Sequence, residues 1–233
     1  MGLPEPYYER DGISIFLGDC RDILPHLPPV DLVLTDPPYG ISYQSHHNSG
    51  RQNSGEWLAW TRRENFAPIC GDEEPFDPAP VLSLGVRTIL WGANHYASRL
   101  PDSSAWIWWD KLGDMGPCDQ ADGELAWTNL RGPVRRFVHE WRGLIRRGEE
   151  NVVSAYKLHP NQKPVRLMRW CIEKAGDGVS TILDPFMGSG TTLVAARDLG
   201  RKAIGIEIEE RYCEIAVRRL SQQLLPFEAA AHG

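Results

Sequence analysis

The sequence predicts an α/β fold built around a mainly parallel sheet. Short apolar runs typical of buried strands alternate with longer segments whose apolar residues recur at helical spacing. Two of the apolar runs end abruptly, one in a proline-rich turn and one in a glycine-rich turn. Because ligands of such folds bind at the carboxyl ends of the strands, these two turns are the candidate functional elements.

The elements follow from apolar runs and from the residues that end them. Buried strands are expected at residues 13–17, 31–35, 87–91, 105–109, 124–128, 181–183 and 203–206. Helices are expected at 164–175, at 191–199 and at 209–224, with Pro164 in the first turn of one and Gly200 ending another. Segment 44–55 is polar and is expected to be mobile, and residues 226–233 to form a flexible tail.

Composition narrows the class of protein. A chain of 233 residues suits a single domain over residues 1–233. We expect a cytoplasmic protein without a membrane partner, because the sequence has neither a long apolar stretch nor a secretory start. The five cysteines are scattered without a Cys-x-x-Cys pair, so neither a metal site nor a disulfide framework is expected.

The glycine-rich turn at residues 184–192 joins a strand to a helix. Gly188 and Gly190 let the backbone approach a ligand, and the helix start offers unpaired N–H groups. No lysine follows Gly190, and an acidic residue, Asp184, lies in the turn, which disfavours phosphate. Glu207 ends the next strand, where an acid can bind ribose hydroxyls. A ligand with ribose, ammonium and carboxylate groups is S-adenosylmethionine; the alternative is an ordinary glycine turn beside a surface glutamate.

The proline-rich turn, Asp36-Pro37-Pro38-Tyr39, fits chemistry on an amine conjugated with a base ring. Such an amine is a poor nucleophile and needs acceptors for its hydrogens, which the Asp36 carboxylate and the Pro37 carbonyl would supply. Tyr39 would stack on a base flipped out of the duplex. The plain alternative is a tight Pro-Pro turn that closes a strand.

These segments resemble the motifs of the amino-directed DNA methyltransferases. Residues 36–39 resemble their D-P-P-Y motif, residues 184–192 their F-x-G-x-G motif, and residues 159–164 their H-P-x-Q-K-P element. With the catalytic motif first, the order resembles the beta group of the family, and the small size resembles phage-encoded members. The resemblance implies a Rossmann-like, circularly permuted S-adenosylmethionine-dependent methyltransferase fold with a short target-recognition insert.

The resemblance also implies site residues. Asp19 matches the family's aspartate that meets the adenine of the cofactor. Cofactor contacts are implied, besides Asp19, for these residues: Lys163, Asp184, Pro185, Phe186, Gly188, Ser189, Gly190, Thr191, Thr192 and Glu207.

A basic segment lies where the family keeps target recognition, and we place the insert at residues 129–158. Although the formal net charge of the chain is −6, six arginines are concentrated here. They suit contacts with double-stranded DNA, and the alternative is a solvated basic face. The insert is short, so either the target site is short or a homodimer shares recognition. The expected DNA-binding residues are Arg131, Arg135, Arg136, Arg142, Arg146 and Arg147.

The resulting hypothesis is transfer of a methyl group to N6 of adenine in DNA, as in restriction-modification. Asp36 favours adenine over cytosine N4 by family likeness, and N4-cytosine methylation is the alternative. Methylation of a protein or free amino acid and a catalytically silent DNA-binding subunit are further alternatives. Cys118 follows Pro117 as in carbon-5 cytosine methyltransferases, but it lies in a loop, and we expect no nucleophilic role.

Overall fold

We describe the fold from a computed structural model of the chain. The structure describes residues 2–41, 70–114, 116, 121–142, 145–146 and 162–221, without the side chains of residues 142, 145 and 146. Several sequence expectations lie outside these residues: the polar segment 44–55, residues 159–161 of the H-P-x-Q-K-P element, Cys118, Arg147 and the tail 226–233.

A nine-stranded sheet forms the centre of the described structure. In sheet order its strands are β1 (Tyr8–Arg10), β2 (Ile13–Leu17), β11 (Lys202–Glu207), β10 (Thr181–Asp184), β3 (Leu32–Thr35), β4 (Arg87–Trp91), β6 (Gly123–Thr128), β5 (Ile107–Asp110) and β7 (Arg135–Val138). The five strands from β2 to β4 are parallel, whereas β1 and β6 run antiparallel to their neighbours. β5 and β7 pair in parallel.

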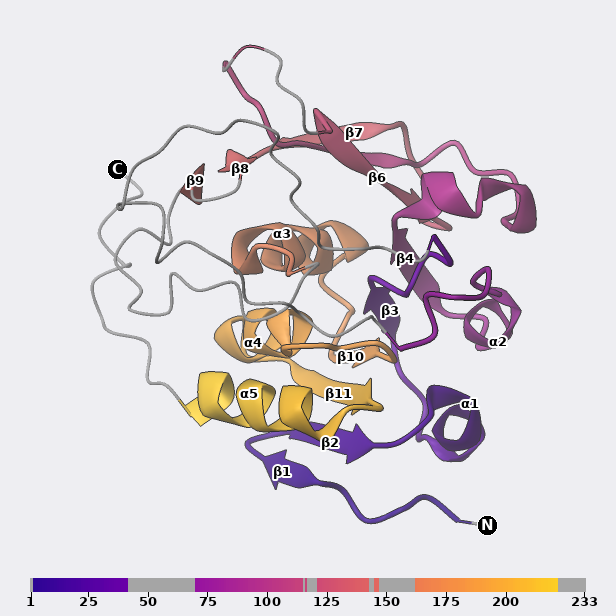
Figure 1. Cartoon of the computed structure of the whole chain (residues 1–233), viewed down its shortest axis with the longest axis vertical. Helices are drawn as coiled ribbons and strands as arrows, with labels where there is room; N and C mark the ends of the chain where they lie inside the picture. The colour runs from indigo at the N-terminus through magenta and orange to yellow at the C-terminus, as the bar shows by residue number, and fades with distance from the viewer. Residues whose placement is uncertain are drawn as a thin grey trace, which may run out of the picture.

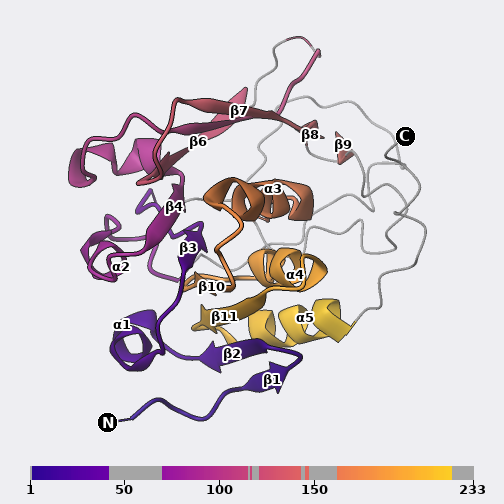
Figure 2. The ribbon, with the colours of Figure 1, turned by 180° about the vertical axis from the view of Figure 1, so that it is seen from behind.

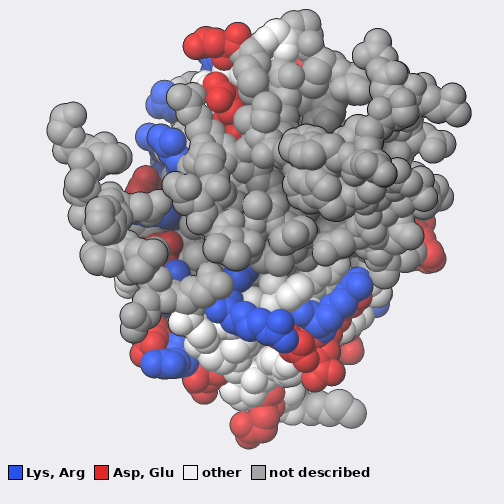
Figure 3. Space-filling model, turned by 60° about the vertical axis from the view of Figure 1, so that its left-hand side comes forward, with Lys and Arg blue, Asp and Glu red and all other residues white. Residues whose placement is uncertain are grey.

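Helices cover both faces of the sheet (Figures 1 and 2). One face carries α3 (Val165–Ala175), α4 (Thr191–Asp198) and α5 (Glu210–Ser221). The other carries α1 (Cys20–Ile23), α2 (Ala79–Leu82) and the short 3₁₀ helices η1 (Leu24–His26), η3 (Ala93–His95) and η4 (Ala97–Arg99). Figure 3 shows one face of the molecule, where basic and acidic side chains of the described residues lie next to each other.

The alternation of side chains along the strands explains the two layers. Leu32 and Leu34 of β3 pack under α3 and α4, while Val33 between them packs on the opposite face. Strands buried on both faces are apolar throughout, which is why β3 reads as a continuous apolar run.

The predicted α/β fold with a mainly parallel sheet is confirmed. The structure adds β1, α1 and α2, which the sequence analysis did not expect, and β7, which continues the main sheet inside segment 129–158. A separate hairpin of β8 (Trp141–Arg142) and β9 (Ile145–Arg146) follows β7. Within the described ranges, no helix is long and apolar enough to cross a membrane.

Candidate active site

Four carboxylates lie at the carboxyl ends of neighbouring parallel strands. Asp19 follows β2, Glu207 ends β11, Asp184 ends β10 and Asp36 follows β3. Because these strands are parallel and adjacent, their ends meet at one edge of the sheet, which we call the carboxyl edge. The structure therefore brings both sequence-predicted turns together, although more than 140 residues separate them in the chain.

The catalytic turn is held by contacts from several elements. Its Tyr39 hydroxyl donates to Oδ1 of Asp36 at 2.5 Å. The backbone N–H groups of Tyr39 and Gly40 donate to Oδ1 of the buried Asp72, at 2.9 and 2.8 Å. The Tyr39 ring stacks on His95 of η3, with centroids 4.8 Å apart and planes 12° apart. The turn thus presents a carboxylate beside an aromatic ring, as the sequence predicted.

Gly92 makes room for that ring at the end of β4. It has a φ of +69°, and a Cβ placed there would lie 2.0 Å from Cε1 of Tyr39. A side chain at this position would displace the ring. Segment 91–96 therefore lines the catalytic turn through its glycine and through the His95 ring.

The second oxygen of Asp36 contacts Lys163, which lies immediately before Pro164, the N-cap of α3. The Lys163 Nζ also lies 3.0 Å from Oε2 of Glu124, the second residue of β6. Lys111 pairs with the other oxygen of Glu124. The structure places Lys163, implied as a cofactor residue by the family resemblance, against the catalytic carboxylate.

Burial and charge act against each other in this cluster. Burial raises the pKa of Asp36 above its usual range, and the positive charge of Lys163 partly offsets that rise. Burial disfavours the charged form of Lys163, but Asp36 and Glu124 outweigh it and raise the pKa of the lysine. Glu124 would also be raised by burial, but Lys163 and Lys111 lower its pKa. The lysines therefore favour the charged form of both carboxylates, fully offsetting burial at Glu124 and only partly at Asp36.

The glycine-rich turn joins β10 to α4. Asp184 accepts a hydrogen bond from the Thr35 hydroxyl at 2.7 Å and one from the Phe186 N–H at 3.2 Å. Gly190 has a φ of +76°, and a Cβ there would lie 2.7 Å from Cβ of Ala216, so the glycine also allows α5 to pack closely. Burial raises the pKa of Asp184 to about 6, since its hydrogen bonds only partly offset the loss of solvent.

Glu207 is tied directly to this turn. Its carboxylate accepts hydrogen bonds from the N–H groups of Gly188 and Glu209, both at 2.9 Å. Burial raises its pKa to about 7. The turn and the acid predicted to bind ribose therefore form one unit.

Other residues implied at the cofactor site have structural partners. Arg219 of α5 donates to the carbonyl and hydroxyl oxygens of Ser189, at 2.7 and 3.0 Å, and to the hydroxyl of Thr191 at 3.0 Å. Thr192 and Pro185 are buried, and the Phe186 ring packs edge-to-face on Phe76. These side chains shape the turn, and their direct contact with a cofactor stays a prediction.

Asp19 begins α1. Its carboxylate accepts from the N–H of Arg21 at 2.9 Å and pairs with the guanidinium of the same residue at 2.5 Å. The hydrogen bond with the Arg21 side chain is the main cause that lowers its pKa. The preceding Gly18 donates its N–H to the Glu207 carbonyl at 2.9 Å, which places Asp19 beside the end of β11. Its implied role toward adenine stays a prediction.

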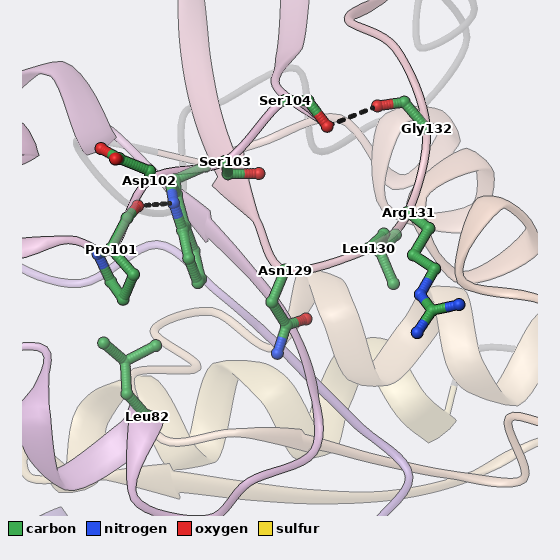
Figure 4. A pocket seen from close by; sticks show the side chains of 10 residues that line it. Leu82, Pro101, Asp102, Ser103, Ser104, Asn129, Leu130, Arg131 and Gly132 are labelled. Carbon is green, nitrogen blue, oxygen red and sulfur yellow. Dashed lines mark hydrogen bonds between the residues drawn. The ribbon is translucent and has the colours of Figure 1, made fainter.

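The expected DNA-binding arginines that the structure describes are spread along segment 129–158, and Arg136 pairs with Asp110, the last residue of β5. Arg131 lines an open cleft beside Asn129 and Ser103, at the opposite edge of the sheet (Figure 4). Arg136 on β7 pairs with Asp110 at 2.5 Å and lies 5.3 Å from the ring centroid of Trp108. Arg135 is exposed on the same strand. Arg142 and Arg146 fall on the β8–β9 hairpin, with undescribed side chains.

Three residues of the site were missed by the sequence analysis: Glu124, Lys111 and Asp72. Glu124 reaches the carboxyl edge because β6 is antiparallel to β4, so the start of β6 lies beside the end of β4. A charged residue at the start of an otherwise apolar strand was the available signal. Among the described residues, no group of three or more His, Cys, Asp or Glu side chains could hold a metal ion.

Comparison with solved structures shows which fold the chain has. The fold is similar to that of PvuII DNA methyltransferase (cytosine-N4-specific), with a TM-score of 0.60, 14% identity and coverage of 94% of this chain and 90% of that one. It is also similar to the M1.HpyAVI–SAM complex, with a TM-score of 0.54, 23% identity and coverage of 89% and 99%. The chain thus has the fold of S-adenosylmethionine-dependent DNA methyltransferases.

Sequence comparisons find similar proteins among the DNA methyltransferases. The N6_N4_Mtase model, described as DNA methylase, matches residues 104–218. The chain is 27% identical to Type II methyltransferase M2.LlaDCHI of Lactococcus lactis subsp. cremoris, covering 94% of this chain and 93% of the relative. It is equally identical to Type II methyltransferase M2.DpnII of Streptococcus pneumoniae, covering 95% and 94%. The likeness to the amino-directed DNA methyltransferases is confirmed, and the family match supports S-adenosylmethionine as the cofactor.

Proposed function

We propose that the chain transfers a methyl group from S-adenosylmethionine to the exocyclic N6 amine of adenine in double-stranded DNA. One observation carries the proposal: the Thr35 hydroxyl, one residue before Asp36, donates to Asp184 at 2.7 Å. The residue before the candidate amine acceptor is thereby in direct contact with the candidate cofactor turn. Direct transfer between two bound reactants needs their reacting atoms about 3–3.5 Å apart, and such adjacent sites suit it.

The residues of the carboxyl edge fit the proposed cofactor. Asp184 and Glu207 are acceptors that suit an ammonium group and ribose hydroxyls, and they disfavour phosphate. The free N–H groups at the start of α4 suit a carboxylate. Asp184, Glu207 and the glycine turn would hold the cofactor, with Asp19 near its adenine. When bound, S-adenosylmethionine supplies an activated methyl group.

Asp36 and its turn would act on the target amine. The carboxylate accepts one amine hydrogen and the Pro37 carbonyl the other, so that the nitrogen lone pair can turn toward the methyl group. The N–C bond forms as the C–S bond breaks, and the nitrogen gives up a proton to the Asp36 carboxylate. Tyr39, braced on one face by His95, offers its other face to a base flipped from the duplex.

The choice of adenine rests on Asp36, since cytosine-N4 members of the family more often carry serine there. The cytosine-N4 specificity of the PvuII enzyme belongs to that enzyme, and its 14% identity reflects the fold. N4-cytosine methylation is therefore the alternative that the assay below must separate. Intact Asp36, Tyr39, Asp184 and Glu207 disfavour a silent DNA-binding subunit.

Segment 129–158 is proposed to contribute to target recognition. Arg135 and Arg136 would contact phosphates, although Arg136 must share its guanidinium with Asp110. The same proposal has four further parts. The chain would recognise DNA as a homodimer and would have the circular permutation of the beta group. It would be of phage type and would serve restriction-modification in the cytoplasm. The type II relatives support the restriction-modification role.

Methylation with labelled cofactor tests the proposal. The chain is incubated with duplex DNA and labelled S-adenosylmethionine, the DNA is digested, and the labelled nucleoside is identified. We expect N6-methyladenine from the wild type, and a rate about a hundred- to a thousandfold lower from Asp36→Ala with unchanged cofactor affinity. Cys118→Ser is the matched control and should stay active. Label on N4 of cytosine would replace the adenine proposal, and an active Asp36→Ala with an inactive Cys118→Ser would refute amine methylation.

A further inference from the structure

Four charged side chains form a partly buried row beside the catalytic turn. In order they are Asp36, Lys163, Glu124 and Lys111, so that the sign of the charge alternates. Their side chains are 13%, 4%, 26% and 17% exposed. Lys163 is the most buried of the four and contacts both acids. Such an arrangement is costly to build, because each charge loses solvent that the partners must replace.

The row is assembled from elements that are distant in sequence. Asp36 follows β3, Lys111 follows β5, Glu124 lies at the start of β6, and Lys163 immediately precedes α3. The β6 backbone places Glu124, and the start of α3 places Lys163. Both acids of the row therefore lie at the carboxyl edge of the sheet, and the Lys163 ammonium contacts both.

Each carboxylate oxygen of Asp36 has a partner that fixes the orientation of the side chain. Oδ2 contacts Lys163, and Oδ1 accepts the Tyr39 hydroxyl. The other titratable groups around Asp36 are Glu124, Asp184 and Tyr96, of which the two acids oppose a further negative charge. Among the described neighbours of Asp36, the positive charge comes from Lys163.

We propose that Lys163, anchored by Glu124, is a positioning residue that holds the Asp36 carboxylate ionised and oriented toward the target amine. The inference rests on the proposed function and assigns Lys163 to the amine side of the site, instead of the cofactor side that family resemblance implies. Lys163 acts through Asp36 and need not touch either reactant. Glu124 acts one step further away, by holding the ammonium in place.

The charge of Lys163 and its anchoring by Glu124 should have different effects on the pH dependence of kcat. Lys163→Met removes the cation, so the pKa of Asp36 should rise and the acid limb of kcat should move up by about 1–3 pH units. Lys163→Arg keeps the charge and should restore most of the profile. Glu124→Gln removes a nearby negative charge, so kcat should fall without an upward move of the acid limb.

Lys111→Met is the matched control, because Lys111 contacts Glu124 and not Asp36. It should move the acid limb less than Lys163→Met does. Cofactor affinity, measured by calorimetry, should stay within about twofold of wild type in every variant. A wild-type acid limb in Lys163→Met, or a loss confined to cofactor affinity, would overturn the inference. If Lys163→Met does not fold, the double variant Lys163→Met/Glu124→Gln removes one charge of each sign and takes its place.

A second readout separates this inference from the proposed function. The carboxyl carbon of Asp36 is followed by ¹³C NMR while the pH is changed, in the wild type and in Lys163→Met. A higher midpoint in the variant supports the positioning role even if the wild type methylates no DNA, and that second result would refute only the proposed function. Equal midpoints would refute the positioning role even if the wild type is active.

Discussion

Cofactor affinity should depend on pH through Glu207. Without ligand, burial raises the pKa of this carboxyl to about 7 from its ordinary 4.5. That difference corresponds to about 3 kcal/mol in favour of the neutral form. Ribose hydroxyls donate hydrogen bonds to an ionised carboxylate, so binding should lower the pKa again and release a proton.

Cofactor affinity should fall as the pH falls. Below about 7 a proton must leave Glu207 before ribose binds, so affinity should fall about tenfold for each pH unit below that value. Below about 6 Asp184 should add to the slope, because burial raises its pKa to about 6. The folding stability of the ligand-free protein should change with pH in the direction opposite to that of cofactor affinity. The folded chain binds more protons than the unfolded chain between about 4.5 and 7, so stability should fall as pH rises through that window.

Calorimetry with S-adenosylhomocysteine from pH 5.5 to 8 measures this effect, and two buffers of different ionisation enthalpy count the protons released. Glu207→Gln should remove the step near pH 7 and weaken binding at pH 8 by about 1–3 kcal/mol. Glu214→Gln, on the exposed face of α5, is the control and should keep the wild-type slope. A wild-type affinity that does not change between pH 6 and 8 would remove Glu207 from the cofactor site.

Three further substitutions test the surroundings of the site. Gly92→Ala should displace the Tyr39 ring and lower methyl transfer about a hundredfold at unchanged cofactor affinity, and normal activity would contradict the close approach. Asp72→Ala leaves the N–H groups of the catalytic turn without their acceptor and should lower the free energy of unfolding in urea by about 1–3 kcal/mol, with Asp72→Asn closer to wild type. Arg135→Ala with Arg136→Ala should weaken DNA binding and reduce its salt slope by about 2; an unchanged slope would place phosphate contacts elsewhere.

The sequence predicted the elements whose cause is local. β3 and β10 are apolar runs that end in residues unable to continue a strand, and both ends were placed within a residue. β7 was missed because Arg135 and Arg136 gave the segment the look of a solvated insert. The strand forms through tertiary contacts, since Phe137 is buried and Asp110 on the neighbouring strand pairs with Arg136. The sequence of the four residues of β7 could not show that this segment would pair with β5.

For the site too, the sequence predicted the residues whose position depends on local structure and missed those placed by tertiary contacts. Asp36, Tyr39, Asp184 and Glu207 were predicted, because each lies at a strand end with a distinctive turn. Glu124 was missed because its place depends on the antiparallel direction of β6, which depends on the pairing of distant strands. The role of Tyr39 was predicted only for its ring, whereas the structure also gives its hydroxyl a partner in Asp36.

The distribution of charge at the carboxyl edge links the two halves of the proposed reaction. Burial raises the pKa of Asp184, and the negative charge of Asp36 on the neighbouring strand adds to that rise. A ligand that carries positive charge into the glycine turn would favour the ionised form of Asp184. Lys163 supplies the positive charge on the amine side, where the base brings none. In the proposed reaction, Lys163 is therefore the group expected to keep the Asp36 carboxylate ionised.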